Sequence, residues 1–302
     1  MNKNVIIVQV LTLFLVMAIG FVARKCRVLT PVLNKGLTEL LINVTSPLLV
    51  ISAFNFSFSK EKLVIAGFVF LISLVLHAGS FFISKLIYRR FPLERQKLLR
   101  MATIFTNCGF MGYPVVGSLY GSLGIFYTSI YIVVFHLFLW TAGVGLFTGK
   151  TDLQATKKAL LNPGIIAVFI GMLIFLFSIR LPSPMMGAIQ LVGGMTTPLS
   201  MLIIGAMLAD IRPIELFVGL ELYYASFVRL LLLPLLTAGI LMLLKFNGII
   251  LGVCVLAVAM PAGSLLVPLA EQYGGDTPFA SRLVFLSTLL SVLTIPFIIW
   301  VI

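Results

Sequence analysis

The stretch NCGFMGYPVV, residues 107–116, places an asparagine, two glycines and a proline inside a long apolar run. Pro114 lacks a backbone donor and its ring crowds the carbonyl of Phe110, four residues earlier, so a regular helix is interrupted here. Gly109 and Gly112 give the backbone additional freedom just before the proline. In a membrane, such a break is tolerated only where protein or a water-filled cavity covers the freed backbone groups. The stretch therefore predicts an interrupted membrane helix beside a cavity.

The composition of the whole chain favours a membrane-spanning fold. Of the 302 residues, 61% are hydrophobic and 10% are charged, whereas a soluble domain is about half apolar and about a quarter charged. Apolar runs of roughly 20 residues, enough to cross the hydrocarbon core as a helix, recur along the chain. We therefore expect an all-α polytopic membrane protein. Ten candidate spans lie near residues 4–24, 33–53, 63–88, 98–119, 123–147, 163–180, 184–209, 217–244, 248–270 and 279–301.

Basic residues are distributed unevenly between alternate loops. Of the 21 Lys and Arg residues, fifteen fall on one set of loops and five on the other, and Arg229 lies within a span. Loops rich in Lys and Arg stay in the cytoplasm. With an even number of spans, both termini are therefore predicted outside the cytoplasm, in a multi-pass protein of the cytoplasmic membrane. The net charge of +12 has the same origin, so nucleic acid is not an expected partner.

The sequence lacks the patterns that carry covalent chemistry. Cys26, Cys108 and Cys254 have no metal-type spacing and are expected to be free thiols. There are two histidines, and there is no Walker loop, Ser/His/Asp set or pair of carboxylates. We expect neither an enzyme nor a cofactor nor a metal site.

Two pairs of related motifs indicate an internal duplication. VTSPLL (residues 44–49) recurs as MTTPLS (residues 195–200), 151 positions later, and Asn107 precedes Pro261 in MPAGSLLVPL by 154 positions. Because five spans per copy is an odd number, the second copy enters the membrane from the opposite face. Inverted repeats with paired interrupted spans are typical of secondary transporters that bind substrate near the bilayer midplane. A chance match of Thr-Pro pairs is the alternative, since Pro is common in membrane helices. The predicted organisation is a first five-helix repeat (1–149), a cytoplasmic linker (150–162) and a second, inverted repeat (163–302).

The two breaks provide the candidate substrate site. A half-helix that begins at Pro114 leaves free N–H groups near Val115–Gly117, which carry a partial positive charge and attract anions. Either Pro261 or Pro268 begins the corresponding half-helix in the second break. Asn107 offers two donors and an acceptor for a ligand, or alternatively bonds a neighbouring helix, which is worth about 1 kcal/mol. The candidate substrate-binding residues are Asn107, Gly109, Tyr113, Pro114, Val115, Pro261, Gly263, Ser264 and Pro268.

Further polar residues within the spans are candidates for coupling or polar support. Hydroxyls at the proline kinks suit a sodium ion or a polar substrate group, or are ordinary back-bonding groups. His77 is either a coupling proton carrier or a core histidine. Arg229, which costs roughly 2.5–3.5 kcal/mol at a bilayer centre, pairs with a substrate carboxylate, pairs with Glu39 or extends to the membrane surface. The set is Thr45, Ser46, Thr196, Thr197, His77 and Arg229.

The chain resembles the auxin efflux carrier family of membrane transport proteins over nearly its whole length. The resemblance is carried by NCGFMGYPVVGSLYG, MPAGSLLVPLAEQYGGD and the two T-[ST]-P-L kinks together. The resemblance implies a ten-helix fold similar to bile-acid sodium symporters and sodium/proton antiporters, in which the interrupted fourth and ninth helices cross at the substrate site. It also implies that Asn107 contacts a substrate carboxylate and that Pro114 is the crossover proline. Ala262 stands where plant members have glutamine, and the connection between the fifth and sixth spans is short. The chain is therefore more similar to bacterial members, several of which are described as malate or malonate permeases.

The predicted function is secondary or facilitated transport of a small organic anion, either a dicarboxylate such as malate or malonate or an auxin-like carboxylate, by alternating access. Proton coupling, sodium coupling and uncoupled transport remain open, and a homodimer is a further hypothesis. One alternative is a ligand-binding receptor on the same fold. Another is a cation/proton antiporter, which needs carboxylates on the broken helices, whereas Glu271 and Asp276 fall beyond the ninth predicted span.

Overall fold

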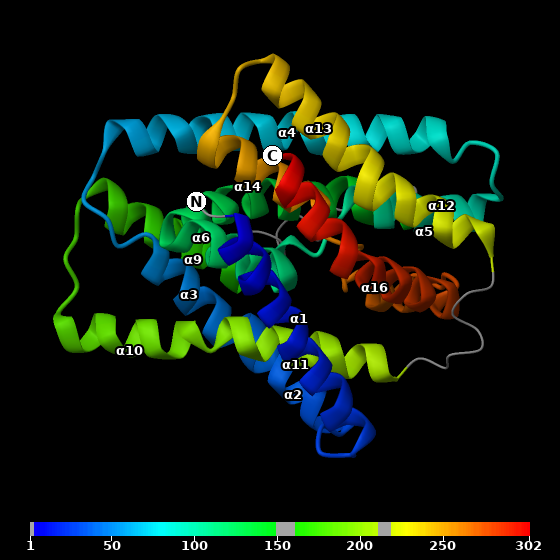
Figure 1. Ribbon diagram of the computed structural model, residues 1–302, viewed down its shortest axis with the longest axis horizontal. Helices are drawn as coiled ribbons and strands as arrows, with labels where there is room; N and C mark the ends of the chain where they lie inside the picture. Colours follow the sequence, from blue (N-terminus) through cyan, green and yellow to red (C-terminus); the bar gives the residue numbers. More distant parts are fainter. Residues whose placement is uncertain (1–2, 149–160, 211–218) are drawn as a thin grey trace. The chain divides into compact units, whose positions relative to one another are not determined.

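The computed structural model describes residues 3–148, 161–210 and 219–302, and within these ranges the named elements are all helices (Figure 1). Most of the predicted linker 150–162 lies outside the described residues. The helices, with π-helical turns labelled η, are α1 Lys3–Lys25, α2 Pro31–Leu40, η1 Leu41–Thr45, α3 Ser46–Ala53, α4 Lys60–Ile87, α5 Leu93–Ile104, η2 Cys108–Gly112, α6 Tyr113–Phe138, η3 Leu139–Gly143, α7 Val144–Thr148, α9 Pro163–Leu176, α10 Ser183–Gly194, α11 Thr196–Ala209, α12 Leu220–Phe227, η5 Val228–Leu232, α13 Leu233–Leu243, α14 Gly248–Ala259, α15 Leu266–Gln272 and α16 Thr277–Val301.

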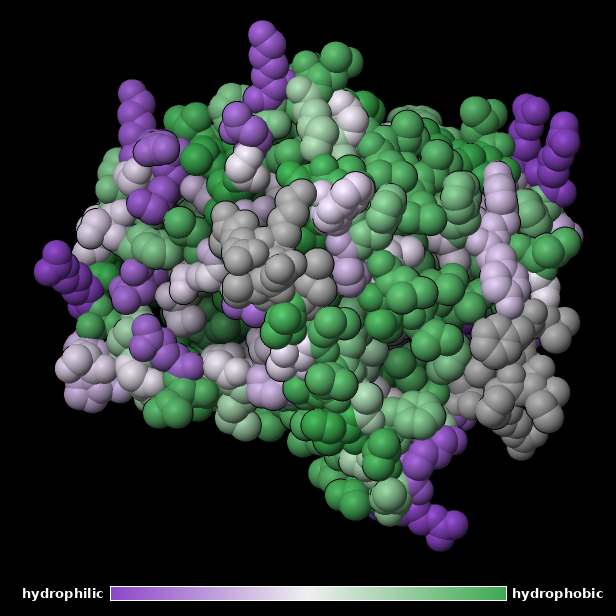
Figure 2. All heavy atoms as spheres, in the orientation of Figure 1, coloured by the Kyte–Doolittle hydropathy of each residue, from purple (hydrophilic) through white to green (hydrophobic). Residues whose placement is uncertain are grey.

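Seven helical stretches of the described chain are long and apolar enough to cross a membrane, and the expectation of an all-α polytopic membrane protein is confirmed in this form. The longest stretch, Cys108–Thr148, has 41 residues. Within it Gly121 has φ 59° and ψ −147°, a non-helical conformation that kinks α6. Pro163–Leu176 and Gly248–Ala259 are shorter apolar helices. Figure 2 shows that the surface in view is mostly hydrophobic, as expected for a surface that contacts lipid.

Three of the π-helical turns share a position relative to a proline. The turns η1, η2 and η5 each end two residues before a proline, namely Pro47, Pro114 and Pro234. In an α-helix the proline ring would clash with the carbonyl four residues earlier, which in each case belongs to the π-turn. The wider π-turn accommodates the ring without ending the helix. A proline in these spans therefore produces a local widening, whereas a complete break requires further residues.

The described chain forms two compact units, each assembled from segments of both sequence halves. Unit 1 comprises Met1–Gly67, Gly109–Val133 and Lys158–Asp210, and unit 2 comprises Phe68–Cys108, Val134–Lys157 and Ile211–Ile302. The predicted repeats are continuous along the sequence, so neither compact unit coincides with one predicted repeat.

In unit 1, α1 packs along α11 at very short range (Figure 1). A Cβ atom on Gly20 would clash with the carbonyl oxygen of Leu202, and one on Gly205 would clash with the carbonyl oxygen of Met17. Only glycine permits this approach of the two backbones. Arg24 at the end of α1 also bonds Asp210 at the end of α11, with Nε and Oδ1 2.5 Å apart.

In unit 2, α14 is the central helix. Every residue from Leu251 to Ala259 is buried, as expected for a helix that is apolar on all sides. At the periphery, Arg95 of α5 contacts Glu221 of α12 at 3.6 Å and Asp276, the N-cap of α16, at 3.0 Å. These ion pairs connect the first turns of α5, α12 and α16.

Candidate functional site

Two helices of unit 2 stop inside the unit, and their continuations pair with each other. Residues 105–107, between α5 and η2, and residues 260–265, between α14 and α15, are not helical. Thr106 and Ala262 form an antiparallel β-bridge. We call residues 105–107 the first arm and residues 260–264 the second arm. The paired arms are the candidate site.

Main-chain hydrogen bonds on both sides of this bridge join the arms. The Asn107 N–H donates to the Pro261 carbonyl at 2.8 Å, and the Gly263 N–H donates to the Phe105 carbonyl at 2.9 Å. The Ala262 N–H donates to Oγ of Ser287, in α16, at 3.2 Å. Backbone groups released by the two breaks therefore satisfy one another, as a buried interruption requires.

The arms approach so closely that the second arm requires a glycine. A Cβ atom on Gly263 would lie 3.2 Å from the carbonyl oxygens of both Phe105 and Thr106. By contrast, a Cβ atom on Gly109, just after the first arm, would meet no atom within 4 Å. Gly263 therefore supports the pairing, and Gly109 lines open space.

The position of the first break differs from the sequence prediction. The helix does not begin anew at Pro114, because η2 starts at Cys108 and Pro114 is the second residue of α6. The free N–H groups of this half-helix therefore belong to its first residues, which begin at Cys108. The prediction that they lie near Val115–Gly117 is wrong. The break occurs earlier because pairing with the second arm, rather than the proline, holds residues 105–107 out of the helix.

The second break also differs from either alternative considered for it. Pro261 lies in the non-helical arm, and Pro268 is the third residue of α15, within its first turn. Neither proline is the first residue of the half-helix. Pro268 lies where a missing N–H costs no helical hydrogen bond, and its side chain is exposed.

The first arm contributes two buried polar side chains. Asn107 is 4% exposed, and its Nδ2 donates to Oγ of Ser264, in the second arm, at 3.2 Å. Thr106 is 2% exposed, and its Oγ1 has no hydrogen-bond partner among the described residues. Sequence reasoning missed Thr106, although its place immediately before Asn107 was a usable signal. Ser287 was also missed, and no local pattern distinguishes it.

Arg229 lies behind the paired arms, at the ends of both broken helices. Its Nη1 donates to the Thr103 carbonyl of α5 at 2.6 Å, its Nε donates to the Met260 carbonyl at 3.1 Å, and its Nη2 donates to the Val258 carbonyl of α14. C-terminal helix ends carry partial negative charge, which the guanidinium offsets. One side chain therefore caps α5 and α14 together.

The surroundings of Arg229 bear on two of the three alternatives for this residue. The side chain is 2% exposed, so the prediction that it extends to the membrane surface is wrong. It bonds buried carbonyls instead. Glu39 is exposed on α2 and is absent from the ion pairs of the described residues. Among the buried described residues, Arg229 is the only Lys, Arg, Asp or Glu. Contact with a substrate carboxylate stays a prediction.

His77 has the surroundings of a core histidine. It is buried in α4, its Nδ1 donates to the Ser73 carbonyl at 2.8 Å, and its ring packs against Phe135 and Phe138 with centroids 6.1 and 5.4 Å apart. The bond to Ser73 fixes the proton on Nδ1. Coupling through His77 stays a prediction.

Four predicted substrate residues, Gly109, Tyr113, Pro114 and Val115, belong to unit 1. Tyr113 is buried and its hydroxyl donates to Oγ of Ser129 at 3.2 Å. Pro114 and Val115 are also buried, and Gly109 is half-buried. Their part in substrate binding stays a prediction.

The four kink residues also lie in unit 1, where the α2–α3 and α10–α11 segments pack together. Thr45 and Thr196 are buried, and neither Oγ1 has a hydrogen-bond partner among the described residues. Ser46 and Thr197 are half-buried. The related motifs nevertheless differ in backbone: Thr45 ends a π-turn, whereas Thr196 follows a turn at Met195 that separates α10 from α11.

No group of three or more His, Cys, Asp or Glu residues in the described chain could hold a metal ion. The arms offer an amide, hydroxyls and capped helix ends, which suit a polar or anionic ligand.

Known proteins match this chain over nearly its whole length. The model of the membrane transport protein family matches residues 5–299. A transporter from Methanothermobacter thermautotrophicus is 29% identical over 294 residues, covering 95% of each chain. A transporter from Methanocaldococcus jannaschii is 22% identical over 305 residues, covering 97% of each. Both relatives are described as uncharacterized transporters. The resemblance to the auxin efflux carriers is thus confirmed at the level of the family, and the chain belongs to the membrane transport protein family.

Proposed function

We propose that this protein moves a small organic anion across the cytoplasmic membrane by alternating access, as a secondary transporter or facilitator. The substrate class is a dicarboxylate such as malate or malonate, or an auxin-like carboxylate. Membership of a membrane transport family supports transport as the activity. The paired helix breaks in unit 2 support the location, because broken membrane helices mark the binding sites of secondary transporters.

The observation that carries the choice of an anion is the cap formed by Arg229. The C-terminal ends of α5 and α14 both point their carbonyls toward the paired arms, and uncompensated they would repel an anion. Arg229 donates to carbonyls at both ends. The cap removes the repulsion that an anion would meet at these helix ends. A cation would find no buried carboxylate among the described residues, which argues against the antiporter alternative.

Within this site, Asn107 is the proposed ligand-binding side chain. Its amide is held by Ser264 in this structure, and the same donor can turn to a carboxylate oxygen of the substrate. The Thr106 hydroxyl, which lacks a partner among the described residues, is the proposed second donor. Gly263 and Pro261 act through the backbone of the second arm, and Pro268 through the half-helix that follows it.

We also propose ten membrane spans with both termini outside the cytoplasm. Gly121 divides the 41-residue stretch, with α5 completing the span before it, and α9 and the pair α14–α15 supply the shorter spans. Cys26, which is exposed, then lies in a cytoplasmic loop. A membrane-impermeant maleimide should label Cys26 only after cell lysis, whereas a single cysteine placed at Lys245, with Cys26 replaced, should react on intact cells. The opposite pattern would reject this topology.

The test of the function is uptake by purified protein in liposomes. Labelled malate, malonate and an indole carboxylate should be offered separately, and at least one should accumulate in the liposomes. Asn107→Ala should abolish uptake. Asn43→Ala is the matched control and should transport normally, since this exposed amide on η1 donates to the local Glu39 carbonyl and to no other described residue. Saturable binding without flux would favour the receptor alternative, and full uptake by Asn107→Ala would remove the site assignment.

Coupling is a separate question that the same liposomes address. If protons are coupled through His77, an imposed pH gradient should drive uptake and His77→Gln should uncouple it. If sodium is coupled through the kink hydroxyls, replacing sodium should stop uptake and Thr45→Val or Thr196→Val should reduce its sodium dependence. Uptake driven by the anion gradient alone would indicate a facilitator.

A further inference from the structure

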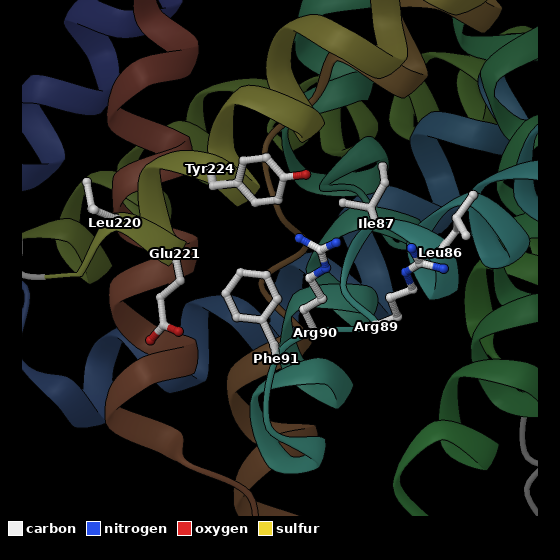
Figure 3. Close-up of a pocket in the computed structure, with 8 residues that line it drawn as sticks. All are labelled: Leu86, Ile87, Arg89, Arg90, Phe91, Leu220, Glu221 and Tyr224. Carbon is white, nitrogen blue, oxygen red and sulfur yellow. The ribbon is translucent and has the colours of Figure 1, made fainter.

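An open pocket of about 580 Å³ lies in unit 2, between the end of α4 and the start of α12 (Figure 3). Its volume falls within the range of about 300–1,000 Å³ that is usual for small-molecule sites. None of its residues takes part in the paired arms. The lining residues are Leu86, Ile87, Arg89, Arg90, Phe91, Leu220, Glu221 and Tyr224.

The pocket contains two guanidinium groups whose charge is not neutralised within the described chain. Arg89 and Arg90 follow the last turn of α4, are exposed, and form no ion pair with any described carboxylate. The pocket's own carboxylate, Glu221, contacts Arg95 instead, at 3.6 Å. Figure 3 shows the Arg90 guanidinium pointing toward Tyr224, on the side of the pocket away from Glu221. The pocket therefore has a cationic side suited to an anion.

Aromatic and apolar side chains form the rest of the wall. The rings of Phe91 and Tyr224 are stacked, with centroids 6.3 Å apart and an interplanar angle of 20°. At the rim, Leu86 is 65% exposed and Leu220 is 88% exposed. In a membrane protein such exposed leucines face acyl chains, and tyrosine beside them is typical of the headgroup level.

We propose that this pocket binds the headgroup of an anionic phospholipid. The phosphodiester accepts hydrogen bonds from Arg89 and Arg90, whose planar guanidinium groups match two phosphate oxygens. The two acyl chains lie over opposite ends of the pocket, one over Leu86 and the other over Leu220 and Tyr224 (Figure 3). A free phosphate would contact only the arginines and would leave the exposed leucines without an apolar partner. The presence of both arginines and exposed leucines at one pocket therefore favours a lipid. Basic pockets between helices on the cytoplasmic side recognise lipid headgroups in this way.

The simplest competing explanation is that the arginines only set topology, as basic residues in cytoplasmic loops do. That explanation requires no selectivity among lipids and no distinction between one basic residue and the next. Lys85 offers the matched comparison, because it is exposed, lies in the last turn of α4 and is not part of the pocket lining. The proposal does not depend on the transported substrate, and its readout is binding rather than uptake.

The test measures the thermal unfolding midpoint of the full-length protein in detergent micelles that contain either dioleoyl phosphatidylglycerol or dioleoyl phosphatidylcholine at equal mole fraction. Phosphatidylglycerol should raise the midpoint above that in phosphatidylcholine. The double variant Arg89→Gln/Arg90→Gln should lose at least half of this difference, and each single variant should lose part of it. Lys85→Gln should retain it.

Three results would overturn the proposal. Equal midpoints in the two lipids would show that no headgroup is selected, and an equal loss in Lys85→Gln would reduce the effect to general charge. An increase produced fully by inorganic phosphate in phosphatidylcholine micelles would identify a free anion as the ligand. Because all three substituted residues are exposed, the variants should fold; mass spectrometry of the lipid that remains bound after detergent exchange provides a second measurement of the same selectivity.

Discussion

The two arms that pair in unit 2 derive from equivalent positions in the predicted repeats, yet they are held in different ways. The second arm is fixed mainly through its backbone, by close contact at Gly263 and by the bond from Ala262 to Ser287. The first arm uses the same bridge but adds two buried polar side chains, Thr106 and Asn107. This difference fits the proposed division of roles, in which the second arm supports the site and the first arm presents groups to the ligand.

Arg229 donates hydrogen bonds to carbonyls at the ends of both broken helices, so its loss should have the largest effect. Arg229→Met leaves three buried carbonyls without their donor, at about 1–3 kcal/mol each. We expect a large fall in the thermal midpoint in detergent and loss of the monodisperse peak in size-exclusion chromatography. Arg229→Lys should recover only part of the lost thermal midpoint, since one ammonium group cannot reach carbonyls on two helices as a guanidinium does. The exposed Arg180→Met is the control, and wild-type behaviour of Arg229→Met would disprove the cap.

Gly263 and Gly109, the glycines near the two arms, should differ clearly in how much an added Cβ atom destabilises the protein. Gly263→Ala forces a Cβ atom to 3.2 Å from two carbonyl oxygens, and such overpacking costs typically about 1–3 kcal/mol. Gly109→Ala meets no atom within 4 Å and should change the free energy of unfolding by less than about 0.5 kcal/mol. Thermal unfolding of both variants measures the difference. Equal destabilisation would mean that the arms do not differ in packing.

Removing one polar contact from each arm should separate stability from transport. Ser287→Ala deprives the buried Ala262 N–H of its acceptor and should destabilise by about 1 kcal/mol. Asn107→Ala removes a bond to the half-buried Ser264, where water can substitute, and should have a smaller effect on stability while abolishing uptake. Unfolding midpoints and liposome uptake should be measured on both variants. A stable, active Ser287→Ala beside an unstable Asn107→Ala would reverse the assigned roles.

The smallest effect on stability is expected at Thr106. Thr106→Val keeps the shape but removes a buried hydroxyl that has no partner among the described residues, so the free energy of unfolding should stay within about 0.5 kcal/mol of the starting value. Uptake should nevertheless fall, because the proposed second donor to the anion is lost. Unchanged uptake would confine ligand contact on this arm to Asn107.

Much of this architecture can be predicted from the sequence, because it depends on local composition. Apolar runs longer than about 18 residues predict membrane helices, and the structure has them. Pro47, Pro114 and Pro234 mark perturbed turns through a missing donor and a bulky ring, and each follows a π-turn. Asn107 can be selected from the sequence as a candidate site residue, because an amide buried in an apolar helix costs free energy unless it forms hydrogen bonds.

The tertiary structure alone decided where the break lies and what holds it. The local signals for the bend, Gly109 and Pro114, follow residues 105–107. These three residues are extended because the second arm, more than 150 positions away, offers backbone partners. Likewise, the sequence shows a charge at Arg229 but not its three carbonyl partners, which come from two other helices. Local chemistry determines that a membrane helix is perturbed, whereas satisfying the released donors and acceptors depends on segments distant in sequence, which only the folded chain brings together.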